Sequence, residues 1–151
     1  MNKPITVRLA KETDAEALFR LNRDFNEDEA AGLKRIRTCL RENPMETVAI
    51  AFVGDAPAGF LCGQKLRSMC YDVDYVELTE LFVAEKFRRR GVASRLMGFL
   101  EECYRRQGIE HFQLFTGGDN RRAQALYEKL GFFRTEEVFM RKRPGRLADK
   151  R

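Results

Sequence analysis

Arg88-Arg89-Arg90-Gly91-Val92-Ala93 is the stretch that decides the fold of this 151-residue chain. Strand-like residues end at Val83, and apolar residues recur at helical spacing from Val92 onward. A strand that leads into a glycine turn and then a helix is typical of phosphate binding, because the first helical amides have no intrahelical partner and carry the positive end of the helix dipole. Gly91 also lets the backbone approach a ligand closely. The stretch therefore predicts a phosphate site at the start of a helix.

Hydrophobic periodicity on both sides of this stretch predicts a mixed sheet flanked by helices. Alternating residues predict strands at 5–9, 48–52, 60–66, 75–83 and 111–115, with a last strand or pair of strands at 132–140. Helical spacing predicts helices over about 13–24, 30–42, 92–107 and 123–130. Thr13 stands three residues before Glu16, which predicts a capping box at the first helix. The fold class is α/β, with two strand-to-helix passages that suit parallel pairing.

Composition narrows the class of protein. A hydrophobic fraction of 44% suits one compact domain, predicted over residues 1–143, with a basic tail at 144–151. No apolar run approaches the roughly 20 residues that span a bilayer, so we expect a cytoplasmic protein without a membrane partner. The four cysteines form no C-x-x-C pair and His111 is the one histidine, so we expect free thiols, no metal site and a structural or surface role for His111.

Two motifs resemble those of the GNAT superfamily of N-acetyltransferases. The superfamily's cofactor motif reads Q/R-x-x-G-x-G/A, and Arg88, Gly91 and Ala93 match its fixed positions. The second signature matches Asn120-x-x-Ala123-x-x-Leu126-Tyr127-x-x-x-Gly131-Phe132. The resemblance implies a splayed, mostly antiparallel mixed sheet of about seven strands and about four helices, with acetyl-CoA in the cleft where two central strands part.

The resemblance also implies which residues hold acetyl-CoA. The backbone of Leu81, Phe82 and Val83 would pair with the pantetheine arm. Asn120 matches the asparagine that lies near the pantetheine, and it suits a helix N-cap equally well. The pyrophosphate would be bound by the amides of the turn and first helical residues: Arg88, Arg89, Arg90, Gly91, Val92, Ala93 and Ser94.

Amide formation from a thioester needs an unprotonated amine and a proton for the departing thiolate, and direct attack needs no nucleophilic residue. Tyr127 matches the tyrosine close to the CoA sulfur in many GNAT enzymes, which makes it the candidate acid; simple packing is the alternative. Glu77 is the candidate base, because its sequence offset from Val83 matches that of the catalytic carboxylate residue in several histone-type members. Glu80 is the reserve. Strand alternation puts Glu77 and Glu80 on opposite faces unless a bulge resets the register.

The acceptor site in this family is usually built by the first two helices and their connection, here Phe25, Asn26, Glu27 and Asp28. This acidic connection suits a cationic small molecule, such as a polyamine or an amino sugar, or a peptide amine. A solvated loop is the alternative. We also expect a homodimer from the family resemblance.

The net charge of +5 fits a polyanionic partner, either a phosphorylated cofactor or a nucleic acid. The sequence has no aromatic-and-basic RNA motif, so no nucleic-acid partner is expected. Two alternatives to an enzyme remain: a non-catalytic domain that senses acyl-CoA, and a basic nucleic-acid-binding module.

Overall fold

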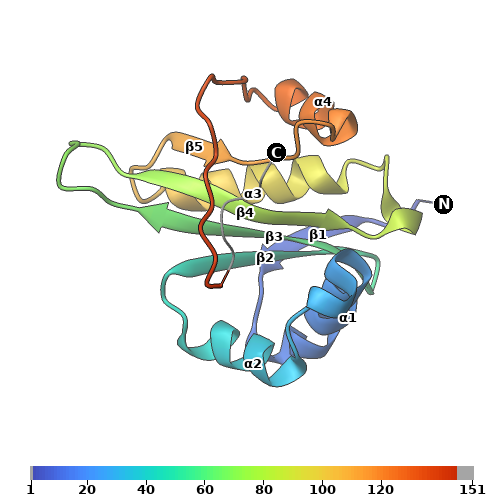
Figure 1. Ribbon diagram of the computed structural model, residues 1–151. Coiled ribbons are helices and arrows are strands. Elements are labelled where there is room, and N and C mark those ends of the chain that lie inside the picture. The colour runs from blue at the N-terminus through green and yellow to red at the C-terminus, as the bar shows by residue number, and fades with distance from the viewer. Residues whose placement is uncertain (1, 146–151) are drawn as a thin grey trace. The chain divides into compact units, whose positions relative to one another are not determined.

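The computed structural model describes residues 2–145, and these residues form one five-stranded sheet (Figure 1). The strands follow the order β1-β2-β3-β4-β5; the first four are antiparallel neighbours, and β4 and β5 are parallel. The strands are β1 (Ile5–Leu9), β2 (Glu46–Val53), β3 (Ala56–Leu66), β4 (Tyr75–Val83) and β5 (His111–Leu114). The predicted mixed α/β fold is confirmed, with five strands among the described residues rather than about seven.

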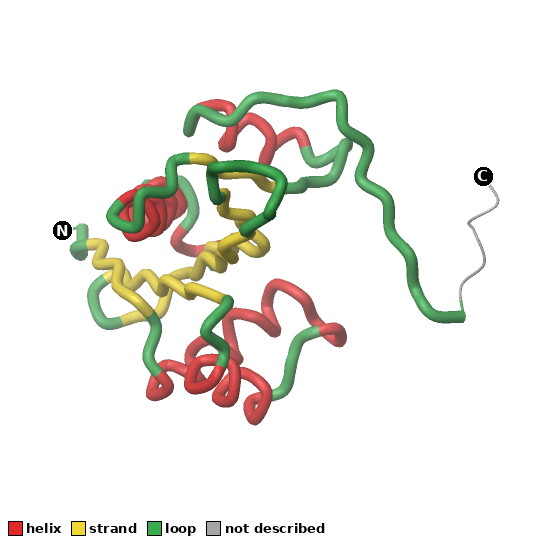
Figure 2. Tube along the Cα trace, turned by 90° about the vertical axis from the view of Figure 1, so that its left-hand side faces the viewer, coloured by secondary structure: helices red, strands yellow, loops and turns green. Residues whose placement is uncertain are grey.

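Four α-helices and three short 3-10 helices complete the described elements. In Figures 1 and 2, α1 and α2 lie against one face of the sheet and α3 lies against the other. The helices are α1 (Ala15–Asn26), α2 (Leu33–Glu42), α3 (Val92–Arg105) and α4 (Arg121–Lys129), and the 3-10 helices are η1 (Glu12–Asp14), η2 (Glu27–Glu29) and η3 (Glu85–Phe87).

The chain divides into two compact units, one that ends at Leu114 and one that begins at Phe115. The first unit contains the whole sheet with α1, α2 and α3, and the second contains α4. The single domain at 1–143 stays a prediction, and residues 146–151 of the predicted basic tail lie outside the described residues.

The predicted last strand at 132–140 is wrong. These residues have no regular secondary structure, and large apolar side chains such as Phe133 and Met140 are exposed. The sequence alternates as a strand does, but a strand also needs a neighbour for its backbone hydrogen bonds, and no ladder forms here. This segment accounts for the difference between the predicted and observed strand numbers.

The start of α1 also differs from the prediction, because its N-cap is Asp14 rather than Thr13. The Asp14 carboxylate accepts hydrogen bonds from Arg8 Nη1 at 2.6 Å, Arg8 Nη2 at 2.8 Å and the Lys11 amide at 2.7 Å. Hydrogen bonding to Arg8 holds the pKa of Asp14 below its ordinary value. A partly buried ion pair therefore joins β1 to the entry of α1.

Strand alternation sends side chains to two separate apolar layers. On the face under α1 and α2, Ile50 and Phe82 pack with Leu18 in one buried cluster. On the opposite face, α3 packs so closely that a Cβ at Gly63 would lie 3.1 Å from Leu100 Cδ2. Polar residues such as Asn22, Glu46 and Gln64 line a cavity beside the first layer.

Candidate functional site

The start of α3 presents backbone amides without helical partners. Gly91 is the N-cap, its φ of +84° lies in the left-handed region, and it makes no side-chain capping hydrogen bond. The first intrahelical hydrogen bond runs from the Arg95 amide to the Gly91 carbonyl at 3.0 Å, so the amides of Val92, Ala93 and Ser94 precede it. A Cβ built on Gly91 would meet no atom within 4 Å. This open turn fits the predicted phosphate site.

The three arginines before Gly91 lie beside this turn. Arg88 Nε donates a hydrogen bond to the Val83 carbonyl at 2.9 Å. Arg89 has a φ of +62°, which bends the chain just before the helix. The guanidinium of Arg90 lies 5.8 Å from the centre of the Phe87 ring. Two of these side chains thus contact residues before the turn, and all three arginines immediately precede Gly91 in the chain.

The end of β4 has one edge without a strand partner. The β5 strand pairs with β4 only as far as Leu78. The hydrogen bond from the Ala84 amide to the Ala58 carbonyl, at 2.8 Å, fixes which residues of β4 point their backbone groups toward β3. By alternation the backbone N–H and C=O groups of Phe82 point toward β3. Those of Leu81 and Val83 point toward the open edge. The geometry fits the predicted pantetheine contacts of Leu81 and Val83 and gives no support for that of Phe82.

A β-bulge places both candidate bases on the same face of the sheet. The β3–β4 register shifts beside Cys62, so that Thr79 is an extra residue on β4. Glu80 lies opposite Cys62, and Glu77 lies opposite Gln64. Because Cys62 and Gln64 are two residues apart on β3, their partners share a face. Simple alternation would have separated the two glutamates, so the bulge exception applies.

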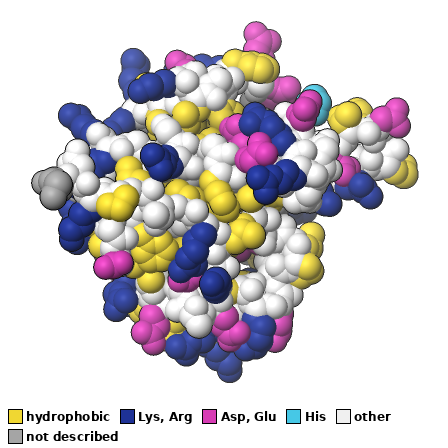
Figure 3. Space-filling model, turned by 180° about the vertical axis from the view of Figure 1, so that it is seen from behind, with side chains coloured by type: hydrophobic (Ala, Val, Ile, Leu, Met, Phe, Trp, Pro, Cys, Tyr) yellow, Lys and Arg dark blue, Asp and Glu magenta, His cyan; other side chains and the backbone are white. Residues whose placement is uncertain are grey.

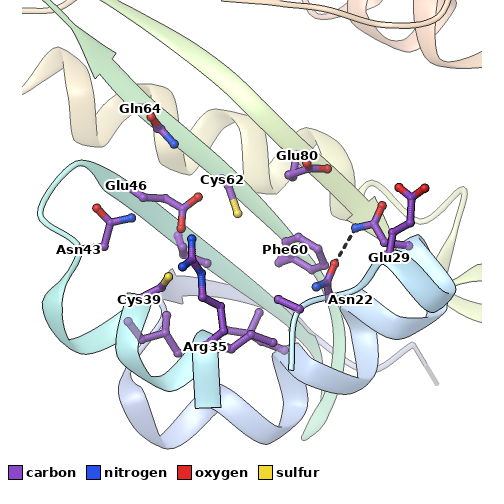
Figure 4. Close-up of a pocket in the computed structure, with 16 residues that line it drawn as sticks. Asn22, Glu29, Arg35, Cys39, Asn43, Glu46, Phe60, Cys62, Gln64 and Glu80 are labelled. Carbon is purple, nitrogen blue, oxygen red and sulfur yellow. Dashed lines mark hydrogen bonds between the residues drawn. The ribbon is translucent and has the colours of Figure 1, made fainter. Parts of the chain in front are cut away.

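A cavity of about 390 Å³ lies between α1, α2 and this face of the sheet (Figure 4). Its apolar lining includes Leu18, Ile36 and Phe60. Its polar lining comprises Asn22, Asn26, Glu29, Arg35, Cys39, Asn43, Glu46, Cys62, Gln64 and Glu80. The cavity therefore combines an apolar base with charged and hydrogen-bonding groups, as small-molecule sites do.

The charged groups of the cavity influence one another. Burial raises the pKa of Glu46, and Arg35 partly offsets this rise. Burial also raises the pKa of Glu80, and the charge of Glu46 adds to the effect. Cys62 is only 8% exposed, and burial together with both carboxylates raises its pKa well above the ordinary value for a thiol. Cys62 is therefore a protonated thiol and a poor nucleophile.

Of the two predicted bases, only Glu80 lines the cavity. The carboxylate of Glu77 instead accepts a hydrogen bond from Gln113 Nε2, with 3.4 Å between nitrogen and oxygen. Position within the cavity thus favours Glu80 as the residue that meets an acceptor.

The predicted acceptor residues take three different positions. Asn26 lines the cavity. The ring of Phe25 stacks on Phe82, with 5.1 Å between ring centres, and so forms part of the packing. Glu27 and Asp28 are exposed on η2 and are not part of the lining. Only Asn26 of these four residues is placed to touch a molecule in the cavity.

The second unit contains the remaining predicted residues. Asn120 Oδ1 accepts a hydrogen bond from the Ala123 amide at 3.2 Å, so Asn120 is the N-cap of α4. Tyr127 is half-buried, and its ring meets Phe132 edge-on at 6.0 Å. The cofactor role of Asn120 and the acid role of Tyr127 stay predictions. In the first unit, His111 is exposed at the start of β5.

Sequence reasoning missed Arg35, Glu46, Cys62 and Gln64, all of which line the cavity. A signal for three of them was present, because Glu46 shares a strand face with Val48, and Cys62 and Gln64 share one with Phe60. No comparable signal marks Arg35, since its place depends on how α2 packs.

Residues 2–145 contain no group of three His, Cys, Asp or Glu side chains suited to holding a metal ion. None of their helices has the length and apolar character needed to cross a membrane.

Known proteins resemble this chain in sequence. The family model described as "Acetyltransferase (GNAT) family" matches residues 12–132. An aminoglycoside N(6')-acetyltransferase type 1 of Salmonella typhimurium is 35% identical over 75 residues, 49% of this chain and 52% of that protein. A thialysine N-epsilon-acetyltransferase of Caenorhabditis elegans is 31% identical over 86 residues, 55% of this chain and 51% of that protein. The chain thus matches only about half the length of these relatives.

Solved structures share the fold. The aminoglycoside N-acetyltransferase AAC(6')-Iy in complex with CoA has a TM-score of 0.83 and 22% identity, over 95% of this chain and 97% of that chain. The family match at residues 12–132 includes the turn before α3, the cavity strands and α4. This chain is therefore a member of the acetyltransferase (GNAT) family.

Proposed function

We propose that this protein is an N-acetyltransferase that transfers an acetyl group from acetyl-CoA to a primary amine bound in the cavity under α1 and α2. The observation that carries the proposal is the cavity itself, where the carboxylates of Glu29, Glu46 and Glu80 line a space suited to a small cationic molecule. The family match supplies the reaction type.

The first unit offers groups that suit acetyl-CoA. The free amides of Val92, Ala93 and Ser94 bind the pyrophosphate, assisted by the dipole of α3. The outward backbone groups of Leu81 and Val83 hold the pantetheine arm. Bound acetyl-CoA supplies an activated thioester carbonyl.

Glu80 is the base in this proposal, with Glu77 as the alternative. The amine arrives as an ammonium ion, and Glu80 takes its proton directly or through water. Burial and Glu46 raise the pKa of Glu80, which makes it a stronger proton acceptor. Glu80 is preferred because it lines the cavity, whereas Glu77 is hydrogen-bonded to Gln113.

The neutral amine then attacks the thioester carbonyl carbon. A carbon–nitrogen bond forms, the carbon–sulfur bond breaks, and Tyr127 gives a proton to the departing thiolate. The amine loses its second proton, and Tyr127 regains one. The products are an amide and a free thiol, with one proton released to solvent.

The acidic lining supports a cationic acceptor, such as a polyamine, an amino sugar or a peptide amine. The names of the relatives agree with small amines, since one is an aminoglycoside acetyltransferase and another a thialysine acetyltransferase. We also propose that the protein forms a homodimer, which the exposed apolar side chains of Phe133, Val138 and Met140 support.

The test is thiol release from acetyl-CoA over a panel of polyamines, amino sugars, amino acids and peptides. The proposal expects release that depends on both the protein and at least one amine, with the acetylated amine found by mass spectrometry. Binding of acetyl-CoA without release on any amine would instead identify an acyl-CoA sensor.

A nucleic-acid-binding module is the remaining alternative. On the face drawn in Figure 3, Lys and Arg side chains are spread among Asp and Glu side chains. A continuous basic surface is the usual electrostatic footprint of a nucleic-acid site, so this face gives the alternative no support.

A further inference from the structure

The sheet wall of the cavity carries a carboxylate that transfers no proton in the reaction proposed above. Glu46 is the first residue of β2, where it lies opposite Gln64 of β3. Its side chain is half-buried and points into the cavity (Figure 4). Removing a carboxylate from water costs free energy unless a positive group lies beside it. The position of Glu46 therefore favours the binding of a cation inside the cavity.

The surroundings of Glu46 on the sheet lack such a cation. Cys62 lies next to it and is more than nine-tenths buried, with its Sγ directed into the cavity (Figure 4). Its thiol makes no hydrogen bond to any other residue that the structure describes. Glu80 follows on β4, opposite Cys62. The sheet wall thus presents two carboxylates on either side of an unpartnered thiol, and all three face the same space.

The helix wall provides one positive group. Arg35 of α2 reaches into the cavity toward Glu46 (Figure 4). Arg35 forms no ion pair within 4.0 Å of a carboxylate among residues 2–145, although its charge acts on Glu46. Three carboxylates against one guanidinium leave the lining with a net charge of −2. A single amine that loses its proton before it reacts would leave this negative charge without a counter-charge.

We propose that Glu46 binds a second ammonium group of an acceptor that carries two amino groups, while the first amino group reacts beside Glu80. The inference rests on the proposed function and narrows its substrate class to diamine-like molecules, including polyamines and amino sugars. Glu46 acts as a specificity-determining residue: it holds the part of the acceptor that does not react. The positive charge of Arg35 partly offsets the negative charge of Glu46 and so weakens the attraction between Glu46 and the ammonium group.

The experiment compares 1,4-diaminobutane with butylamine, which has the same chain length and one amino group. We expect the wild-type protein to use the diamine with a kcat/KM about tenfold higher, as one partly buried ion pair would give. In Glu46→Gln this preference disappears through a higher KM for the diamine alone, whereas any change in kcat from the lost effect of Glu46 on Glu80 is the same for the diamine and butylamine. Glu42→Gln is the matched control, because Glu42 is exposed on α2 outside the cavity and loses the same charge. It should keep the preference.

Three results would overturn the inference. One is an equal loss for both amines in Glu46→Gln, which would indicate a structural role. Another is a loss of the preference in Glu42→Gln as well, which would indicate a general charge effect. The third is a preference for lysine-like amino acids over diamines that disappears in Arg35→Gln. This result would mean that Arg35 binds the carboxylate of the amino acid in the cavity.

Calorimetric titration of both amines without acetyl-CoA separates this inference from the proposed function. Diamine binding that weakens about tenfold in Glu46→Gln supports the Glu46 site even if no amine is acetylated. Diamine binding that is unchanged in Glu46→Gln overturns it, even if acetyl transfer takes place.

Discussion

Replacing Gly91 by alanine tests the phosphate site, and Gly108 offers a matched control at the other end of α3. Gly91 has a φ of +84° and Gly108 a φ of +81°, and a Cβ on either meets no atom within 4 Å. Neither substitution causes a clash, so each lowers the free energy of unfolding only by the penalty for alanine in the left-handed conformation, about 1 kcal/mol. For a protein of this size that lowers the melting temperature by about 2–4 °C. The two variants should be equally stable.

Their affinities for acetyl-CoA should differ. Gly91→Ala favours a negative φ, which turns the amides of Val92, Ala93 and Ser94 away from the pyrophosphate. A hydrogen bond to a charged group contributes about 1.5–3 kcal/mol, so losing one weakens binding about 10- to 100-fold. Gly108→Ala should bind as the wild-type protein does. Calorimetric titration gives both affinities, and equal affinity for the two variants would refute the reasoning.

Three further predictions concern the reaction and the fold. Glu80→Gln should lower kcat about 100-fold in the thiol-release assay, as loss of a general base does, whereas Glu77→Gln should have little effect; the reverse order would make Glu77 the base. Tyr127→Phe should lower kcat at least tenfold and leave acetyl-CoA affinity in calorimetry unchanged, and an unaltered kcat would remove its acid role. Asp14→Asn should cost about 2 kcal/mol in urea unfolding, because the Arg8 partner remains 42% exposed and water limits the loss. Since the folded pKa of Asp14 is lowered, its stabilisation is present above the unfolded value of about 3.9 and is lost as the pH falls through the folded value, a dependence that should be absent in Asp14→Asn.

Local signals in the sequence were sufficient to predict most of the secondary structure of the first unit. The predicted strand at 75–83 matches β4, because its alternation is regular at both ends. The predicted helix from Val92 starts where α3 starts, since Gly91 provides the conformation that begins it. The hairpin of β2 and β3 follows from turn residues between two apolar runs.

The remaining features depend on contacts between distant segments. The bulge at Thr79 arises from how β4 pairs with β3, and this pairing decides that Glu80 faces the cavity. Arg35 reaches Glu46 only because α2 packs over β2, which periodicity within α2 does not specify. Residues 132–140 show the opposite failure, since their pattern suits a strand but no neighbouring strand pairs with them.

The central claim is that the backbone amides at the start of α3 bind the pyrophosphate of acetyl-CoA. The most direct test is calorimetric titration with acetyl-CoA, with its dephospho form that keeps the pyrophosphate, and with S-acetylpantetheine, which lacks it. We expect the dephospho form to bind nearly as tightly as acetyl-CoA, and S-acetylpantetheine to bind about 100-fold more weakly, as the loss of charged hydrogen bonds requires. S-acetylpantetheine that binds as tightly as acetyl-CoA would contradict the claim.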